Sequence, residues 1–341
     1  MRTKPAKNFP CTMTRKSAFF TLLSMLVMTT GSYGQDPQYS QFYANPLYLN
    51  PALAGASICP RIIGNYRNQW PSLGSAFNSY NGSFDMYLDV LHGGIGLIFN
   101  ADRAGGGNLN TTTISLMYAF KFNITEKLQA STALRAGYYQ RHLVWENLIF
   151  GDQIDPVSGN ILPTSSEKQP DNPRVGVPDF GAGIFLSYDN LVYGGISVDH
   201  LSQPDIGFYS DMTSKLYMKF TIHAGSVINL KGGGDEEREF SISPNILYQQ
   251  QFKFHQLNIG LYLTIDPFVG GLWFRHNFEN PDAIIPMLGI HYKSLRVSYS
   301  YDITVSRLKG ASGGAHEISA SWQFPCIEKR RHIRAIKCPR F

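Results

Sequence analysis

Two neighbouring stretches of sequence decide the fold: residues 112–122 read TTISLMYAFKF, and residues 128–138 read LQASTALRAGY. In both stretches apolar residues alternate with small, polar or charged ones, and the intervening residues 123–127 (NITEK) are typical of a turn. Because successive side chains of a strand point to opposite faces of a sheet, one face of this predicted hairpin is apolar and aromatic and the other is polar. The pattern predicts antiparallel β-structure.

The same alternation recurs between about residues 60 and 324, broken by clusters of Gly, Asn, Asp and Pro. About fourteen strands are predicted, which begin near Arg61, Ala76, Gly94, Thr111, Leu128, Pro178, Leu191, Lys215, Glu239, His255, Pro267, Ala283, Leu295 and Ala315. Charged residues make up 16% of the chain, below the roughly 25% of soluble proteins. A soluble sandwich would show the same alternation, but long strands, scarce charge and aromatic residues at strand ends favour a transmembrane antiparallel outer-membrane β-barrel.

The first 34 residues are predicted to be an export signal. Five basic residues precede the apolar run 18–28 (AFFTLLSMLVM), and Ser32 and Gly34 fit a cleavage site between Gly34 and Gln35. The formal charge of +5 lies entirely in this signal, so the mature chain balances at 25 basic and 25 acidic residues. A nucleic-acid-binding function is therefore not expected.

The mature chain is predicted to have three parts. Residues 35–58 form a short periplasmic N-terminal segment that could fold back as a plug, and residues 59–324 form the barrel, with a long loop at 145–177. Residues 325–341 form a basic periplasmic C-terminal tail. With an even number of strands both termini are expected on the periplasmic side of the outer membrane.

Three cysteines remain after cleavage: Cys59, Cys326 and Cys338. Cys59 precedes the first predicted strand and Cys326 follows the last, so these two could meet across the closing seam. A loop between Cys326 and Cys338 is the rival pairing, and spacing does not choose between them. The cysteine pattern does not fit a zinc site, so no metal is expected.

The residues present no catalytic motif. The sequence lacks G-x-S-x-G, H-E-x-x-H and Walker patterns, and the glycines of residues 93–99 (GGIGLIF) lie in a strand pattern, where small residues serve packing. Asp152 and Asp155 are too few carboxylates for a calcium site and are assigned to turns. The sequence predicts a protein that is not an enzyme and has no cofactor. Four basic residues are expected to face the lumen: Arg135, Lys219, His223 and Arg275.

Barrel physics does not explain residues 35–55 (QDPQYSQFYANPLYLNPALAG), which contain two Asn-Pro steps and four aromatic residues. This string closely resembles the opening of the PorP/SprF family of type IX secretion system membrane proteins of Bacteroidetes-type bacteria. Further similarity lies in residues 151–159 (GDQIDPVSG), 300–304 (SYDIT), 313–319 (GGAHEIS) and 330–341 (RRHIRAIKCPRF). The resemblance covers essentially the whole mature chain.

The resemblance implies an outer-membrane barrel that supports secretion or surface attachment of a partner surface protein, in some members an adhesin used for gliding motility. It implies as partners the periplasmic ring lipoproteins, the translocon and a cargo with a C-terminal sorting domain. A porin-like diffusion channel for small solutes is the alternative function. Two sets of residues are hypothesised to bind partners, one in the N-terminal segment and one in the tail: Asp36, Pro37, Tyr39, Ser40, Gln41, Tyr43, Asn45, Pro46, Leu49, Asn50, Pro51 and Gly55, and Lys329, Arg330, Arg331 and Arg334.

Overall fold

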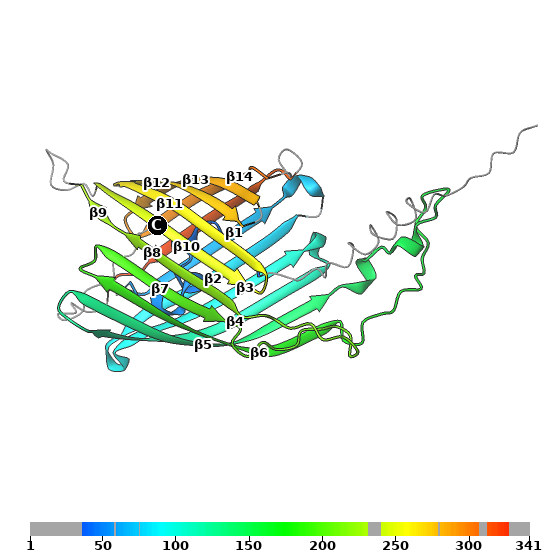
Figure 1. Cartoon of the computed structure of the whole chain (residues 1–341), viewed down its shortest axis with the longest axis horizontal. Helices are drawn as coiled ribbons and strands as arrows, with labels where there is room; N and C mark the ends of the chain where they lie inside the picture. Colours follow the sequence, from blue (N-terminus) through cyan, green and yellow to red (C-terminus); the bar gives the residue numbers. More distant parts are fainter. Residues whose placement is uncertain are drawn as a thin grey trace, which may run out of the picture. The chain divides into compact units, whose positions relative to one another are not determined.

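The alternating segments form strands that pair mainly with their neighbours along the chain, giving one antiparallel sheet (Figure 1). The computed structural model describes residues 36–57, 59–74, 76–230, 240–278, 280–306 and 312–326, and the described residues after Asp36 belong to one compact unit. β1 pairs with β2 on one side and with β15 on the other, so the sheet closes on itself. Among the described residues, no helix is long and apolar enough to cross a membrane.

The described strands are β1 (Arg61–Gln69), β2 (Phe77–Leu88), β3 (Gly93–Ala104), β4 (Leu109–Asn123), β5 (Leu128–Leu143), β6 (Arg174–Tyr188), β7 (Val192–Asp199), β8 (Lys219–Ser226), β9 (Ile228–Asn229), β10 (Phe240–Gln251), β11 (Phe254–Ile265), β12 (Phe268–Asn277), β13 (Asn280–Tyr292), β14 (Leu295–Thr304) and β15 (Ala315–Gln323). β8 and β9 both pair with β10 and follow one another along it, so they act as one interrupted strand. The result is a closed barrel of 14 antiparallel strands, which confirms the predicted fold class.

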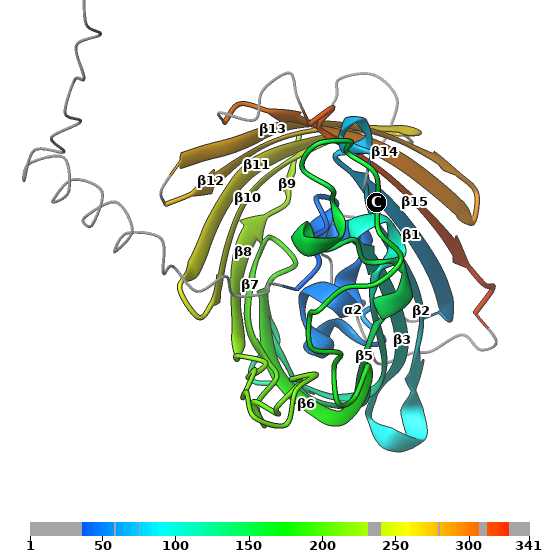
Figure 2. The same ribbon diagram turned by 90° about the vertical axis from the view of Figure 1, so that its right-hand side faces the viewer.

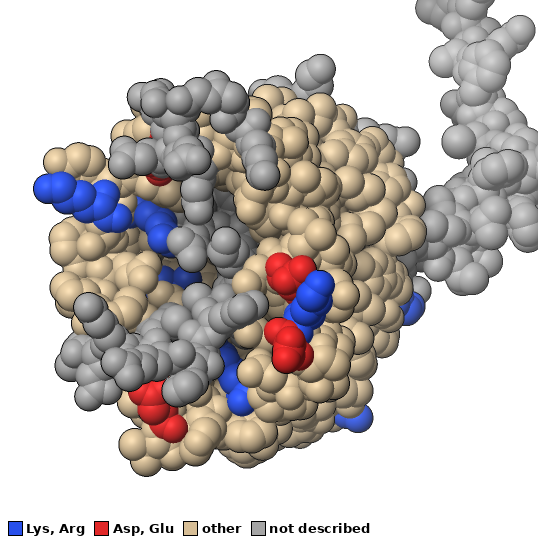
Figure 3. Space-filling model, turned by 90° about the vertical axis from the view of Figure 1, so that its left-hand side faces the viewer, with Lys and Arg blue, Asp and Glu red and all other residues tan. Residues whose placement is uncertain are grey.

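The alternation has the predicted sense. On β4, Ile114 and Leu116 are 48% and 62% exposed on the outer surface, whereas Ser115 and Met117, which alternate with them, are buried inside. The same apolar outer wall surrounds the barrel. Figure 3 views one end of the barrel, where Lys, Arg, Asp and Glu side chains lie around the mouth. An apolar outside with a polar inside is the arrangement of a barrel that stands in lipid.

The two rims of the barrel differ in the length of their connections. β1 begins and β15 ends at one rim, which we call the terminal rim, and several turns there are short, such as 266–267 and 293–294. The opposite rim, which we call the loop rim, carries the two longest connections, 144–173 and 200–218. These two loops contact each other, since Ser210 donates hydrogen bonds to Asp171 and the Tyr209 hydroxyl donates to the Lys168 carbonyl. Figure 2 faces the loop rim.

The start of β6 differs from the expectation. The strand begins at Arg174, although the sequence placed its start near Pro178. Val177 and Pro178 pair with Tyr139 and Tyr138 of β5, so the ladder continues past the proline. Proline lacks an N–H donor and usually marks the beginning or the edge of a strand, which is why the sequence pattern stopped there.

A disulfide joins the two sides of the closing seam. Cys59 lies just before β1, Cys326 just after β15, and their Cα atoms are 4.8 Å apart. The Phe324 N–H also donates a hydrogen bond to the Pro60 carbonyl, 2.9 Å from N to O. Cys338, the partner in the rival pairing, lies outside the described residues, as do residues 231–239.

Candidate functional site: a lumen filled by the N-terminal segment

Residues 37–56, which we call the plug, fold into three short helical turns. These are η1 (Phe42–Ala44), α2 (Pro46–Leu49) and η2 (Pro51–Leu53). Pro46 and Pro51 each occupy the first position of their turn, where a missing N–H costs no hydrogen bond. Asn50, held extended by the following proline, caps η2 by accepting the Ala52 N–H at 2.9 Å. The two Asn-Pro steps thus determine a compact, turning chain.

The plug lies inside the barrel, with α2 visible within the ring of strands in Figure 2. Leu47, Ala52, Leu53 and Ala54 are completely buried, and they belong to one core cluster with side chains that the wall points inward. The wall also binds the plug backbone. Ser131 and Ser197 donate to plug carbonyls at 2.8 and 3.0 Å, and Asp85 accepts the Gly55 N–H at 2.9 Å. The plug therefore occupies the lumen and packs against the inner wall of the barrel.

Glycines in the wall make room for the plug near the terminal rim. A Cβ atom built on Gly94 would overlap the Ala54 carbonyl, and one on Gly96 would lie 2.9 Å from the Leu47 side chain. Both glycines belong to the GGIGLIF string that the sequence assigned to barrel packing. The structure shows that they pack against the plug.

On the facing wall, glycines also leave space for the side chain of Asn50. Its amide nitrogen donates to the Ile184 carbonyl at 3.1 Å and lies 3.3 Å from His223 Nε2. A Cβ atom on Gly183 or Gly195 would collide with the Asn50 side chain. The wall therefore has a recess on β6 and β7 that fits this one carboxamide.

Near the loop rim the contacts are polar and charged. Four buried wall side chains, Arg67, Arg275, Asp302 and Glu317, surround Ser40 and Gln41, and we call them the charged cluster. The Ser40 hydroxyl accepts from Arg67 at 2.7 Å and from Arg275 at 3.2 Å, and it donates to Asp302 at 2.8 Å. Glu317 accepts the backbone N–H groups of Ser40 and Gln41 at 2.6 and 3.1 Å. One carboxylate thus binds two successive peptide groups.

The Gln41 side chain is bound at both ends. Its carbonyl oxygen accepts from Ser298 at 2.6 Å and from Ser319 at 2.8 Å. Its amide nitrogen donates to Ser300 at 3.2 Å and to the Glu317 carbonyl at 2.9 Å. A carboxamide has one acceptor and two donors, and here all of them have partners.

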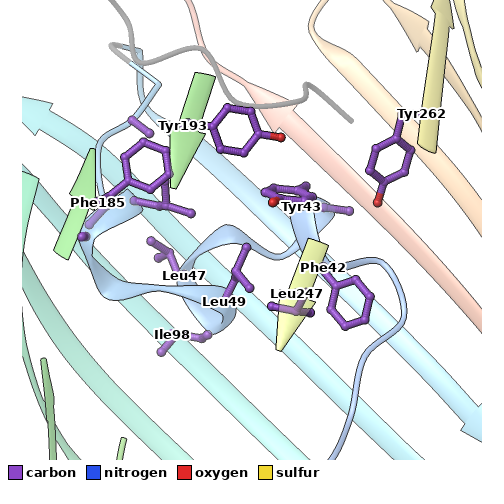
Figure 4. Close-up of a cluster of buried hydrophobic side chains, with 14 of the residues drawn as sticks. Phe42, Tyr43, Leu47, Leu49, Ile98, Phe185, Tyr193, Leu247 and Tyr262 are labelled. Atoms are coloured by element: carbon purple, nitrogen blue, oxygen red, sulfur yellow. The ribbon is translucent and has the colours of Figure 1, made fainter. Parts of the chain in front are cut away.

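Aromatic side chains pack around the next two residues. The Phe42 ring lies 5.1 Å from Trp273 in an edge-on arrangement. Tyr43 packs edge-on against Tyr193, His223 and Tyr262 at 5.8, 6.1 and 6.3 Å between ring centroids (Figure 4). These spacings are in the range of favourable aromatic pairs.

Most of the predicted N-terminal partner-binding residues contact the barrel. Pro37 is half-buried, and the others within the plug are buried: Tyr39, Ser40, Gln41, Tyr43, Asn45, Pro46, Leu49, Asn50, Pro51 and Gly55. Asp36 precedes the compact unit. A partner could reach the buried side chains only after displacing the plug, so their role in partner binding stays a prediction. Gly34, Gln35, Lys329, Arg330, Arg331 and Arg334 lie outside the described residues.

The plug contacts the wall near both rims. Ser40 and Gln41 lie among residues near the loop-rim ends of β1, β14 and β15, whereas Gly55 contacts Asp85 near the terminal rim. The chain therefore runs along the lumen before entering β1. This path buries the apolar and aromatic side chains of the plug, which would be exposed to water outside the barrel.

Sequence reasoning named Arg275 as lumen-facing but missed the rest of the charged cluster. Asp302 and Glu317 lie in SYDIT and GGAHEIS, two strings noticed for their similarity and given no role. The structure brings both strings into contact with the YSQF portion of the N-terminal string. The available signal was that all three strings resembled the family although the barrel pattern explained none of them, which could have suggested that they contact one another. Lys219 and His223 also face the plug, as predicted, through Tyr48 and Asn50.

Among the described residues, no group of three or more His, Cys, Asp or Glu side chains is placed to hold a metal ion. Asp152 and Asp155 instead accept hydrogen bonds from their own loop, including those from Ser166 and Ser158. The plugged lumen is therefore taken as the candidate functional site of the described part of the chain.

Comparisons with solved structures give distant similarities. They include the CymD monoaromatic hydrocarbon channel (TM-score 0.45, 10% identity, 82% of this chain and 93% of that chain). Others are Omp33 of Acinetobacter baumannii (0.43, 9%, 79% and 100%) and the Pseudomonas putida toluene transporter TodX (0.43, 11%, 81% and 92%). No functional conclusion follows from similarities this low. A search of curated proteins finds no match.

A family model gives the decisive result. The model for the type IX secretion system membrane protein PorP/SprF matches residues 31–322, which include the plug and every strand up to the last residues of β15. The match spans most of the chain. The protein therefore belongs to the PorP/SprF family of type IX secretion system membrane proteins.

Proposed function

We propose that this protein is a sealed outer-membrane barrel that supports secretion or cell-surface attachment of a partner surface protein, of the adhesin or gliding type, and that it is not an enzyme. The observation that carries the proposal is the plug. Family membership supplies the secretion context, and a lumen filled with core-like packing suits a docking component better than a passage for solutes. A porin leaves an aqueous channel through its interior.

The orientation follows from the two rims. Barrels of bacterial outer membranes have short periplasmic turns and longer extracellular loops. We therefore assign the terminal rim to the periplasm and the loop rim, with connections 144–173 and 200–218, to the outside. The C-terminal tail then leaves the barrel on the periplasmic side, since β15 ends at that rim. The plug begins near the outer mouth, so only the C-terminal end is assigned to the periplasm.

The tail is proposed to dock the periplasmic secretion components, such as the ring lipoproteins. Residues 325–341 carry six basic residues and one acidic residue. A cluster of one charge sign steers association with a partner of the opposite sign. The outer loops are proposed to face the cargo with its C-terminal sorting domain.

An affinity purification from detergent-solubilised outer membrane tests the proposal. We compare the mature protein, a form ending at Phe324 and a variant with Lys329, Arg330, Arg331 and Arg334 changed to Gln. Recovery of a large surface protein in all three, with periplasmic components lost from the last two, is the expected result. If the tail recovers only anionic lipid, its basic residues bind the membrane and not a secretion component. If the barrel is recovered alone in all three forms, the proposal is rejected.

A further inference from the structure

The charged cluster and its serines form a binding site that recognises a particular peptide sequence. The site contacts the Ser40 hydroxyl with two arginines and an aspartate, and the Gln41 carboxamide with three serines. Glu317 binds the backbone of both residues. The next two positions are aromatic and enter a lining of Trp273, Tyr193 and Tyr262. Along residues 40–43 the wall thus contacts a hydroxyl, a carboxamide and two aromatic rings, in that order, with different side chains for each.

The wall charges do not need the plug for neutrality. Arg67 binds Asp302 at 2.8 Å and Glu317 at 3.2 Å. Arg275 binds Asp302 and Asp282, each at 2.6 Å. Because the charges pair within the wall, removing Ser40 and Gln41 leaves no isolated buried charge, which is the costly outcome of breaking an ionic network. Water could replace the lost hydrogen bonds once Ser40 and Gln41 have left this polar site near the loop rim.

The other half of the plug is held differently. Leu47, Leu53 and Ala54 are completely buried and apolar, and Gly94 and Gly96 leave recesses that match their shape. Withdrawing these groups would expose apolar surface and leave empty space, for which water is no substitute. The two halves therefore differ in how readily they separate from the wall.

We propose that the loop-rim half of the lumen is a peptide-binding site that the chain's own residues 40–43 (SQFY) occupy at rest. Its other occupant is a segment of the partner protein with the same order of side chains: hydroxyl, carboxamide, aromatic, aromatic. Such a segment replaces Ser40–Tyr43 while the terminal-rim half of the plug stays in place. That the partner is the surface protein rests on the proposed function, whereas the existence of the site does not.

The site is tested with purified barrel in detergent and without any partner. A variant that lacks residues 36–43 keeps the apolar half of the plug and empties the site. The probe is a synthetic peptide of residues 36–43 (DPQYSQFY) with a fluorophore at its N-terminus, so that it matches the deleted residues, and anisotropy reports binding. We expect saturable binding to the deletion variant and much weaker binding to the wild-type barrel, whose site is filled.

Selectivity separates this site from nonspecific adsorption. Glu317→Gln in the deletion background places an amide donor against a peptide N–H, and we expect the affinity to fall about ten- to hundredfold. Ser321→Ala, farther along β15, is the matched control and should leave affinity unchanged. A peptide in which Ser40 and Gln41 are exchanged should bind the deletion variant about as weakly as the original peptide binds the Glu317→Gln variant.

The outcome is decisive either way. Heat-modifiable migration on gels and an intact Cys59–Cys326 bond establish that each variant has folded. No saturable binding by a folded deletion variant, or equal binding of the exchanged peptide, overturns the proposal. Because no secretion component takes part, a negative result here leaves the affinity purification, and the proposed function, to be judged independently.

Discussion

Gly94 of β3 lies directly against the carbonyl group of Ala54, so closely that a Cβ atom on Gly94 would overlap the carbonyl oxygen. The contact joins the barrel wall to the last turn of the plug, backbone to backbone. A side chain can rotate away from a new methyl group, but a backbone carbonyl held in a turn cannot. This contact is therefore a sensitive test of whether the plug and barrel form one folded unit.

We predict that Gly94→Ala destabilises the protein by about 1–3 kcal/mol, the usual cost of overpacking a well-filled interior. The midpoint of urea unfolding in detergent, followed by heat-modifiable migration, measures the change. Gly64→Ala on β1 is the control, because a Cβ atom there would have no neighbour within 4 Å. Equal midpoints for both variants would show that the plug yields without cost at this contact.

The filled lumen predicts a barrel that conducts poorly. In planar bilayers we expect the mature protein to show no steady single-channel conductance, since the buried plug residues Leu47 and Leu53 pack with the wall residue Phe185 inside the lumen. Deleting residues 37–56 removes that packing and should give stable open channels. Steady conductance of the intact protein, equal to that of the deletion variant, would favour the porin-like alternative.

The strands could be predicted from the sequence because their signal is local. Alternation such as Ile114, Ser115, Leu116 repeats within one strand, and neighbouring strands are close along the chain. The start of β6 was missed because Pro178 has a strong local meaning that the ladder overrides. Strand positions thus follow from short-range pattern, with errors where a proline interrupts it.

The site could not be predicted in the same way. Ser40 and Glu317 are 277 positions apart, and no periodicity relates them. What brings them together is the closure of the barrel, which sets β15 beside β1, and the path of the plug through the lumen. The sequence indicated a segment with unpartnered aromatic residues that could fold back as a plug, but not which wall residues it would contact.

The seam disulfide predicts a loss of stability on its removal. Cys59 and Cys326 are separated by 267 positions, and removing a native disulfide typically costs about 2–5 kcal/mol. We expect Cys59→Ser with Cys326→Ser to lower the urea midpoint accordingly. Cys338→Ser is the control, and it should leave both the midpoint and the crosslink unchanged. If the double variant matched the wild type, hydrogen bonding between β1 and β15 alone would account for closure of the barrel.

Loop 144–173 predicts a pH dependence at the loop rim. Asp152 accepts hydrogen bonds from the Ser166 N–H and from the hydroxyls of Ser165 and Ser166, and these bonds lower the pKa of its carboxyl below the ordinary value of 3.8. Because the folded loop prefers the ionised form, its ordering is complete above that ordinary value. The ordering is lost progressively as the pH falls from there through the lowered pKa.

Hydrogen exchange of residues 151–166 measures this effect. We expect equal protection at pH 7 and pH 5, with the intrinsic exchange rates corrected for pH, and reduced protection below about pH 3.5. Asp152→Asn should show the reduced protection already at pH 7, because a carboxamide offers one acceptor where the carboxylate offers two. Glu146→Gln, on the same loop, is the matched control. Unchanged protection in Asp152→Asn at pH 7 would mean that the carboxylate does not order the loop.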